Sequence, residues 1–133
     1  NSADYLYCSH VLEDFVDFMP LMSEFCRIVK KDGIIEIRVP NETCTWDSPY
    51  HKRSFNLETF NIISKGNYRY EKNKSLKLTI KKSGFYGVCP LSKFNSFWLN
   101  IFKKIISPFF VSNTPIKYLF PLTYVYCYFE VKK

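Results

Sequence analysis

The 133-residue chain has few glycines, no C-x-x-C pair and no long apolar run. Lys, Asn or Pro interrupts every apolar stretch before the roughly 20 residues that a membrane-spanning helix needs, and no secretion-signal pattern opens the sequence. The five cysteines are odd in number and lack paired spacing. This excludes a secreted disulfide framework and a ribbon-type zinc site, and it favours a reducing, cytoplasmic environment.

Acidic residues are scarce in the second half of the chain. Residues 1–60 hold 6 Lys and Arg against 10 Asp and Glu, whereas residues 61–133 hold 13 against 2. Such an asymmetry indicates an anionic partner for the second half, either nucleic acid or an anionic membrane or glycan. Because the basic runs are interrupted and no recognition motif is present, nucleic acid is the less favoured of these.

The residues that are abundant are apolar, with 47% hydrophobic and 19% aromatic, enough for one packed core. A β-prone run at residues 4–8 is followed by an amphipathic helix, which we expect Asp17 to cap and Asp32-Gly33 to end. A second, β-branched strand follows at residues 34–40. This order forms a βαβ unit with parallel strands, so the sequence predicts an α/β fold.

Further elements are predicted downstream of a polar loop at residues 41–53. They are a helix from Asn56 to a Gly66 stop, strands at 68–70 and 76–80, an amphipathic helix at 94–110 and a closing strand at 123–131. The chain shows no internal repeat and no low-complexity linker, which predicts a single domain over residues 1–133.

Several motifs occur together in residues 1–41. They are Asn1-Ser2-x-Asp4, Cys8-Ser9-His10-Val11-Leu12-Glu13, Leu21-Met22-x-Glu24-Phe25-x-Arg27-Ile28-Val29-Lys30, and Gly33 with Ile37-x-Val39-Pro40-Asn41. In order and without gaps, these motifs resemble the second half of class I S-adenosylmethionine-dependent methyltransferases. Two later motifs are similar to the type 11-like members that act on sugars, lipids or other small acceptors: Pro49-x-His51-x-Arg53-x-Phe55 and Phe120-Pro121. Asp14, where the family usually has His, and Lys31-Asp32, where Pro-Gly is common, depart from the pattern at turns.

The resemblance implies the C-terminal half of a Rossmann-like methyltransferase sheet, with two parallel strands and a closing antiparallel pair. It divides the domain into a βαβ core with an acceptor loop (1–71), a basic aromatic insertion (72–121) and a closing strand (122–133). It also implies S-adenosylmethionine as cofactor and methyl transfer to an oxygen or nitrogen of a small acceptor. The family's Gly-rich cofactor loop has no counterpart, since the sequence contains no G-x-G. We therefore expect a fragment that lacks the N-terminal half of the fold and is inactive alone.

Candidate site residues follow from the position of the strand ends. Open α/β sheets bind ligands beyond the carboxyl ends of their strands. There, the resemblance implies that Cys8, Ser9 and His10 border the cofactor. The loop after the second strand faces the same crevice, and we predict that its His51 is the general base. The residues expected to bind or orient the acceptor are Trp46, Tyr50 and Arg53.

Simpler interpretations apply to the same residues. His10 is also typical of a loop or helix-capping histidine, and His51 of an exposed loop histidine. Ser9 lacks the G-x-S-x-G context of a hydrolase nucleophile. Cys44 and His51 would supply only two metal ligands, and no spacing provides a third and fourth, so no metal site is predicted.

A different class of function is a non-catalytic binding module. In this interpretation the basic aromatic segment docks on an anionic membrane surface or on a partner chain. The stretch at 94–110 fits a helix that covers the sheet or forms an acceptor lid better than a membrane anchor. Without preceding strands, residues 4–8 would form an exposed sheet edge, so we expect a homo-oligomer or aggregation of the isolated chain.

Overall fold

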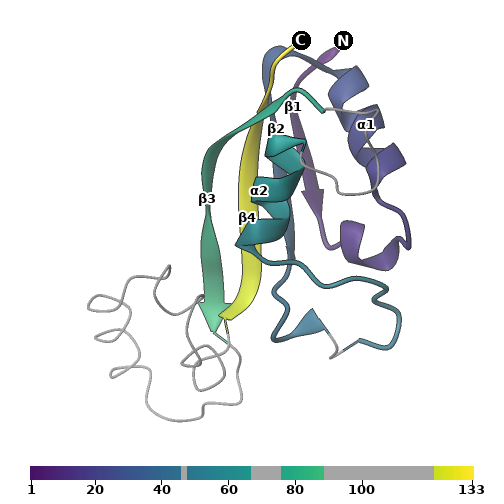
Figure 1. Ribbon diagram of the computed structural model, residues 1–133, viewed down its shortest axis with the longest axis vertical. Helices are drawn as coiled ribbons and strands as arrows, with labels where there is room; N and C mark the ends of the chain where they lie inside the picture. Colours follow the sequence, from purple (N-terminus) through teal and green to yellow (C-terminus); the bar gives the residue numbers. More distant parts are fainter. Residues whose placement is uncertain (46–47, 67–75, 89–121) are drawn as a thin grey trace, which may run out of the picture.

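The computed structural model describes residues 1–45, 48–66, 76–88 and 122–133. These ranges form one sheet and the helices that pack on it, with the two termini close together at one end (Figure 1). In chain order the elements are β1 (Ala3–Ser9), the 3-10 helix η1 (Leu12–Asp14), α1 (Met19–Ile28), β2 (Val29–Pro40), α2 (Leu57–Lys65), β3 (Leu78–Val88) and β4 (Leu122–Val131).

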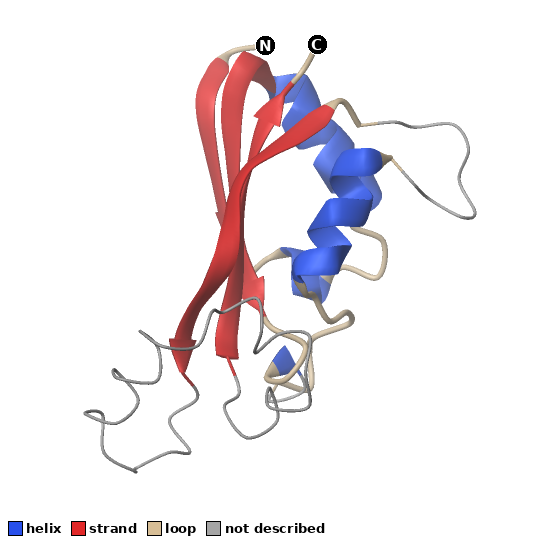
Figure 2. Cartoon of the chain, turned by 60° about the vertical axis from the view of Figure 1, so that its left-hand side comes forward, coloured by secondary structure: helices blue, strands red, loops and turns tan. Residues whose placement is uncertain are grey.

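The four described strands lie in the order β1-β2-β4-β3. β1 pairs with β2 in parallel, whereas β4 pairs antiparallel with both β2 and β3. The predicted α/β fold, with two parallel strands and a closing antiparallel pair, is therefore confirmed. The helices α1 and α2 lie on the same side of this sheet (Figure 2).

Both ends of α1 differ from the predicted ones. At its start the N-cap is Phe18, and the carboxylate of the preceding Asp17 accepts a hydrogen bond from the Met19 N–H at 3.0 Å. The helix ends at Ile28, so Asp32-Gly33 is no helix stop but lies inside β2. There the pairing with β1 shifts register between Ala3 and Tyr5, and Asp32 takes a left-handed φ of 61°. The turn chemistry that predicted a helix end instead forms a bulge.

The second helix begins and ends where the sequence predicts. The side chain of Asn56 accepts a hydrogen bond from the Thr59 N–H at 2.9 Å, and the Thr59 hydroxyl accepts from the Asn56 N–H in return. Gly66 ends the helix with a left-handed φ of 62°. This reciprocal cap satisfies main-chain donors that the first turn of a helix leaves without partners.

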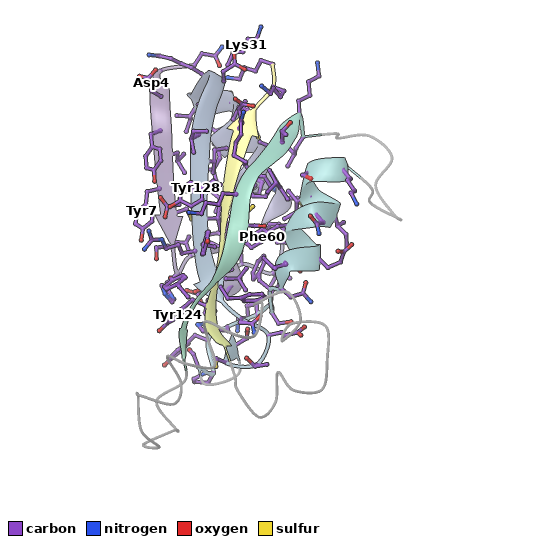
Figure 3. All side chains as sticks on the ribbon, turned by 90° about the vertical axis from the view of Figure 1, so that its left-hand side faces the viewer. Asp4, Tyr7, Lys31, Phe60, Tyr124 and Tyr128 are labelled. Atoms are coloured by element: carbon purple, nitrogen blue, oxygen red, sulfur yellow. The ribbon has the colours of Figure 1, made fainter. Side chains whose placement is uncertain are left out.

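The core lies between the sheet and the helices. Alternate residues of β2 and β4 are buried there, namely Ile35, Ile37, Val39, Val125, Cys127, Phe129 and Val131. Phe60 of α2 packs on Phe129 with ring centres 5.8 Å apart. The opposite face of the sheet is rich in tyrosine; Figure 3 shows Tyr7, Tyr124 and Tyr128 on its strands, with Phe60 on the helix side.

Some predicted elements fall outside the described residues. These are the strand at 68–70 and the amphipathic helix at 94–110. The strand predicted at 76–80 is found in part, since β3 begins at Leu78 and extends to Val88. The closing strand at 123–131 is confirmed as β4. No helix in the described part of the chain is long and apolar enough to span a membrane.

Candidate functional site

The carboxyl ends of β1 and β2 meet at one edge of the fold. Ser9, the last residue of β1, pairs with Arg38, and the His10 N–H donates to the Arg38 carbonyl at 3.0 Å. The parallel pairing fixes this neighbourhood, because both strands run toward the same edge. The loops that follow the two strands therefore start side by side, as predicted.

His10 projects from the end of β1 in an unusual backbone conformation. Its φ of 54° is left-handed, which is uncommon for a residue other than glycine. The imidazole packs edge-on against Tyr124 of β4, with ring centres 5.0 Å apart. Its Nδ1 atom lies 3.3 Å from Oε1 of Glu13, and 45% of the side chain is exposed. His10 is thus held on two sides and open on another.

His51 is held by the loop that follows β2. Asn41 bridges to Phe55, and the Glu42 N–H donates to the Phe55 carbonyl at 2.8 Å, so the two ends of the loop are tied together. Nδ1 of His51 lies 2.5 Å from the Thr45 carbonyl oxygen. A carbonyl only accepts, so Nδ1 carries a proton, and in the neutral ring Nε2 keeps its lone pair.

Glu13 connects the two histidine loops. Its main-chain carbonyl accepts hydrogen bonds from the N–H groups of Lys52 at 2.6 Å and Arg53 at 3.1 Å. Its side chain lies beside His10 and is 1% exposed. Burial raises the pKa of the Glu13 carboxyl, while its own main-chain N–H and the charges of His10 and His51 act to lower it. The structure thus brings the two predicted histidines to one acidic residue.

The other predicted cofactor residues differ in accessibility. Cys8 is buried in β1, and burial, with a smaller contribution from Glu13, raises the pKa of its thiol to about 11. A protonated, buried thiol leaves mainly the main chain of Cys8 for contact with a ligand. Ser9 is partly exposed at the strand end.

The predicted acceptor residues that the structure describes differ in their surroundings. Tyr50 is 76% exposed. The Arg53 guanidinium lies over the Phe18 ring, 5.4 Å from its centre, and its Nε donates to the Val16 carbonyl. Arg53 therefore fastens the loop to the segment before α1. Trp46 lies outside the described residues.

A second polar group surrounds Arg38 on the tyrosine-rich face. The guanidinium lies 5.3 Å from the ring centre of Tyr7 and 5.4 Å from that of Tyr86. Its Nε donates to Glu36 at 2.6 Å, and this hydrogen bond is the main cause that raises the pKa of Arg38. Glu36, which also accepts from the Tyr5 hydroxyl, is buried yet fully paired.

Sequence reasoning missed three contributors to this site: Glu13, Thr45 and Tyr124. A signal for Glu13 was available, because His10 and Glu13 are three residues apart among apolar neighbours, a spacing that places side chains together on one helical turn. Thr45 and Tyr124 gave no local signal. Within the described ranges, no three His, Cys, Asp or Glu side chains gather closely enough to hold a metal ion.

Among the comparisons with known proteins, similarity was found at the level of structure. No protein-family model matches the chain, and no curated protein sequence is similar to it. A solved structure, a SAM-dependent methyltransferase from Archaeoglobus fulgidus, superposes with a TM-score of 0.57 at 18% sequence identity. The match covers 97% of this chain and 59% of that one. The chain therefore has a methyltransferase-like fold and spans about three fifths of that protein's length.

Proposed function

We propose that the protein takes part in S-adenosylmethionine-dependent methyl transfer to an oxygen or nitrogen of a small acceptor, such as a sugar or a lipid. The observation that supports this most is the structural likeness over 97% of the chain to a SAM-dependent methyltransferase. The position of Ser9 and His10 at the end of β1, and of His51 in the loop that follows β2, supports it independently, because ligands of open α/β sheets bind beyond the carboxyl ends of the strands.

The residues at the end of β1 fit one flank of a cofactor site. The Ser9 hydroxyl and the open side of His10 offer polar groups at the strand end, whereas Cys8 fills the core behind them. The sequence contains no G-x-G loop, so these residues supply one flank and not a whole site. The cofactor, when bound, supplies a methyl group that its sulfonium charge already activates.

The chain's own residues would then handle the acceptor. Nε2 of His51 keeps its lone pair, because Nδ1 faces the Thr45 carbonyl, so it is suited to take a proton from a hydroxyl or ammonium group. Tyr50 is exposed and free to orient the acceptor, and we assign the same role to Trp46. Arg53 would contribute mainly by fixing the loop on which His51 lies.

Titration calorimetry with S-adenosylhomocysteine tests the cofactor assignment. A longer product of the same reading frame should bind it, whereas the chain alone, with one flank of the site, should bind it weakly or not at all. In the longer product His10→Asn should weaken binding, while the matched change Asp14→Asn should not. In an assay with a panel of small hydroxyl and amine acceptors, His51→Gln should keep cofactor binding and lose about 10²- to 10⁴-fold in rate. Absence of binding in every form would overturn the methyltransferase proposal.

One observation favours the alternative of a non-catalytic binding module. β1 lies at an edge of the described sheet, and its Tyr5 and Tyr7 are 51% and 53% exposed. An open edge with exposed aromatic side chains is suited to pairing with another chain, including a second copy. Light scattering would show a dimer if so, and flotation with anionic against zwitterionic vesicles would test the membrane variant. A monomer that binds neither kind of vesicle would exclude this alternative.

A further inference from the structure

Glu13 is the most unusual acidic residue of the described chain. It is 1% exposed, and neither carboxylate oxygen accepts a well-formed hydrogen bond from another described residue; Nδ1 of His10, 3.3 Å from Oε1, makes an ion-pair contact. A buried carboxylate without such partners is costly, so native proteins seldom keep one without a use. The side chain lies on η1, between the end of β1 and the start of α1, at the edge where the candidate site lies.

Glu13 contacts one histidine and the loop of the other. Its Oε1 lies 3.3 Å from Nδ1 of His10, and its carbonyl holds the two residues that follow His51. The Tyr124 ring fixes the other side of His10. The side chain of Glu13 therefore contacts His10, and its main chain binds the loop that carries His51.

We propose that Glu13 is a positioning residue, which holds the His10 proton on Nδ1 and leaves Nε2 of His10 as a proton acceptor. An ionised carboxylate can only accept, so beside Nδ1 it selects the tautomer with the proton on that nitrogen. The Thr45 carbonyl makes the same selection at His51. The acid-to-histidine contact thus follows the logic by which a buried carboxylate orients a catalytic imidazole.

The charges of His10 and His51 favour the ionised form of Glu13 that this role requires, whereas burial opposes it, and the pKa is raised overall. Burial raises its pKa and the neighbouring Asp14 adds to this, whereas its own main-chain N–H, His10 and His51 lower it. Burial raises the pKa of the Cys8 thiol, and the charge of Glu13 raises it further. The inference rests on the proposed function only for the reaction in which the acceptor nitrogens take part. The contact between Glu13 and His10 does not depend on it.

The test is the ¹⁵N NMR spectrum of the imidazoles in the full chain at pH 8, without cofactor or acceptor. We expect the His10 proton on Nδ1 in the unmodified protein. Glu13→Leu should move it to Nε2, leave the His51 proton on Nδ1 and unfold at the same or a higher denaturant concentration. Glu13→Gln keeps an acceptor oxygen and should retain most of the Nδ1 form, and Asp14→Asn should change neither histidine.

Several outcomes would overturn the proposal. A His10 proton on Nε2 in the unmodified protein would mean that Glu13 donates rather than accepts. An unchanged His10 tautomer in Glu13→Leu would leave the acid with no influence on the ring. Because the measurement uses no cofactor, a tautomer change without S-adenosylhomocysteine binding would support the positioning role and count against the methyltransferase proposal alone.

Discussion

Replacement of Phe55 by alanine should be among the most damaging changes to stability. Phe55 ends the loop that carries His51, and its side chain is 1% exposed. Its ring packs on Phe18 with centres 5.4 Å apart and on Phe60 at 6.1 Å. The side chain therefore joins the loop to the segment before α1 and to α2.

The expected cost follows from these contacts. Burial of a phenylalanine side chain contributes about 1.5–3 kcal/mol, and each aromatic pair adds about 0.5–1.5 kcal/mol. Phe55→Ala should thus lower the free energy of unfolding by about 3–5 kcal/mol, the range found for such truncations in cores. Phe55→Leu keeps most of the buried area and should cost about 1–3 kcal/mol, mainly from the lost ring pairs.

Urea unfolding followed by far-UV circular dichroism measures these differences, with the midpoint compared at constant denaturant slope. Tyr50→Ala is the matched control, an aromatic truncation in the same loop at a 76% exposed position, and it should change stability by less than about 0.5 kcal/mol. If Phe55→Ala cost no more than Tyr50→Ala, the loop would not be anchored to the core. The placement of His51 would then lose its support.

Three further predictions concern the backbone, a helix cap and the thiols. A Cβ at Gly33 would lie 2.6 Å from Val29 Cγ1 and 2.9 Å from the Asp4 carbonyl oxygen, so Gly33→Ala should destabilise by about 1–3 kcal/mol in urea unfolding. Gly84→Ala, which meets the movable end of Tyr126, should cost less. Asn56→Ala removes the α2 cap and should cost about 1 kcal/mol in the same assay, whereas no loss would argue against the cap. Burial raises the pKa of the Cys8 and Cys26 thiols to about 11 each. Since thiolate forms only as pH approaches that value, both should react with a chromogenic disulfide at pH 8 about 100-fold more slowly in the native protein than in urea, and equal rates would contradict their burial.

The sequence alone determined the elements whose signals are local. Alternating apolar residues predicted β4, and Asn56 with Gly66 set both ends of α2, because capping and glycine conformations depend on a few neighbouring residues. The strand–helix–strand order then predicted the parallel pair, since the crossover geometry is restricted. The same order placed His10 and His51 on loops at one sheet edge.

Only the tertiary structure decided what depends on contacts between distant segments. Asp32-Gly33 resembles a helix stop in sequence, yet it lies inside β2, where the pairing with β1 shifts register and the Asp4 carbonyl approaches Gly33 closely. Glu13 resembles a solvated turn residue, yet it is buried, and its carbonyl accepts hydrogen bonds from the N–H groups of Lys52 and Arg53. Burial and hydrogen bonding across about 40 residues of chain are not encoded in any local pattern, because many competing pairings fit the same residues and packing selects one. This packing places Glu13, which lies in an acidic turn of the sequence, at the centre of the candidate site.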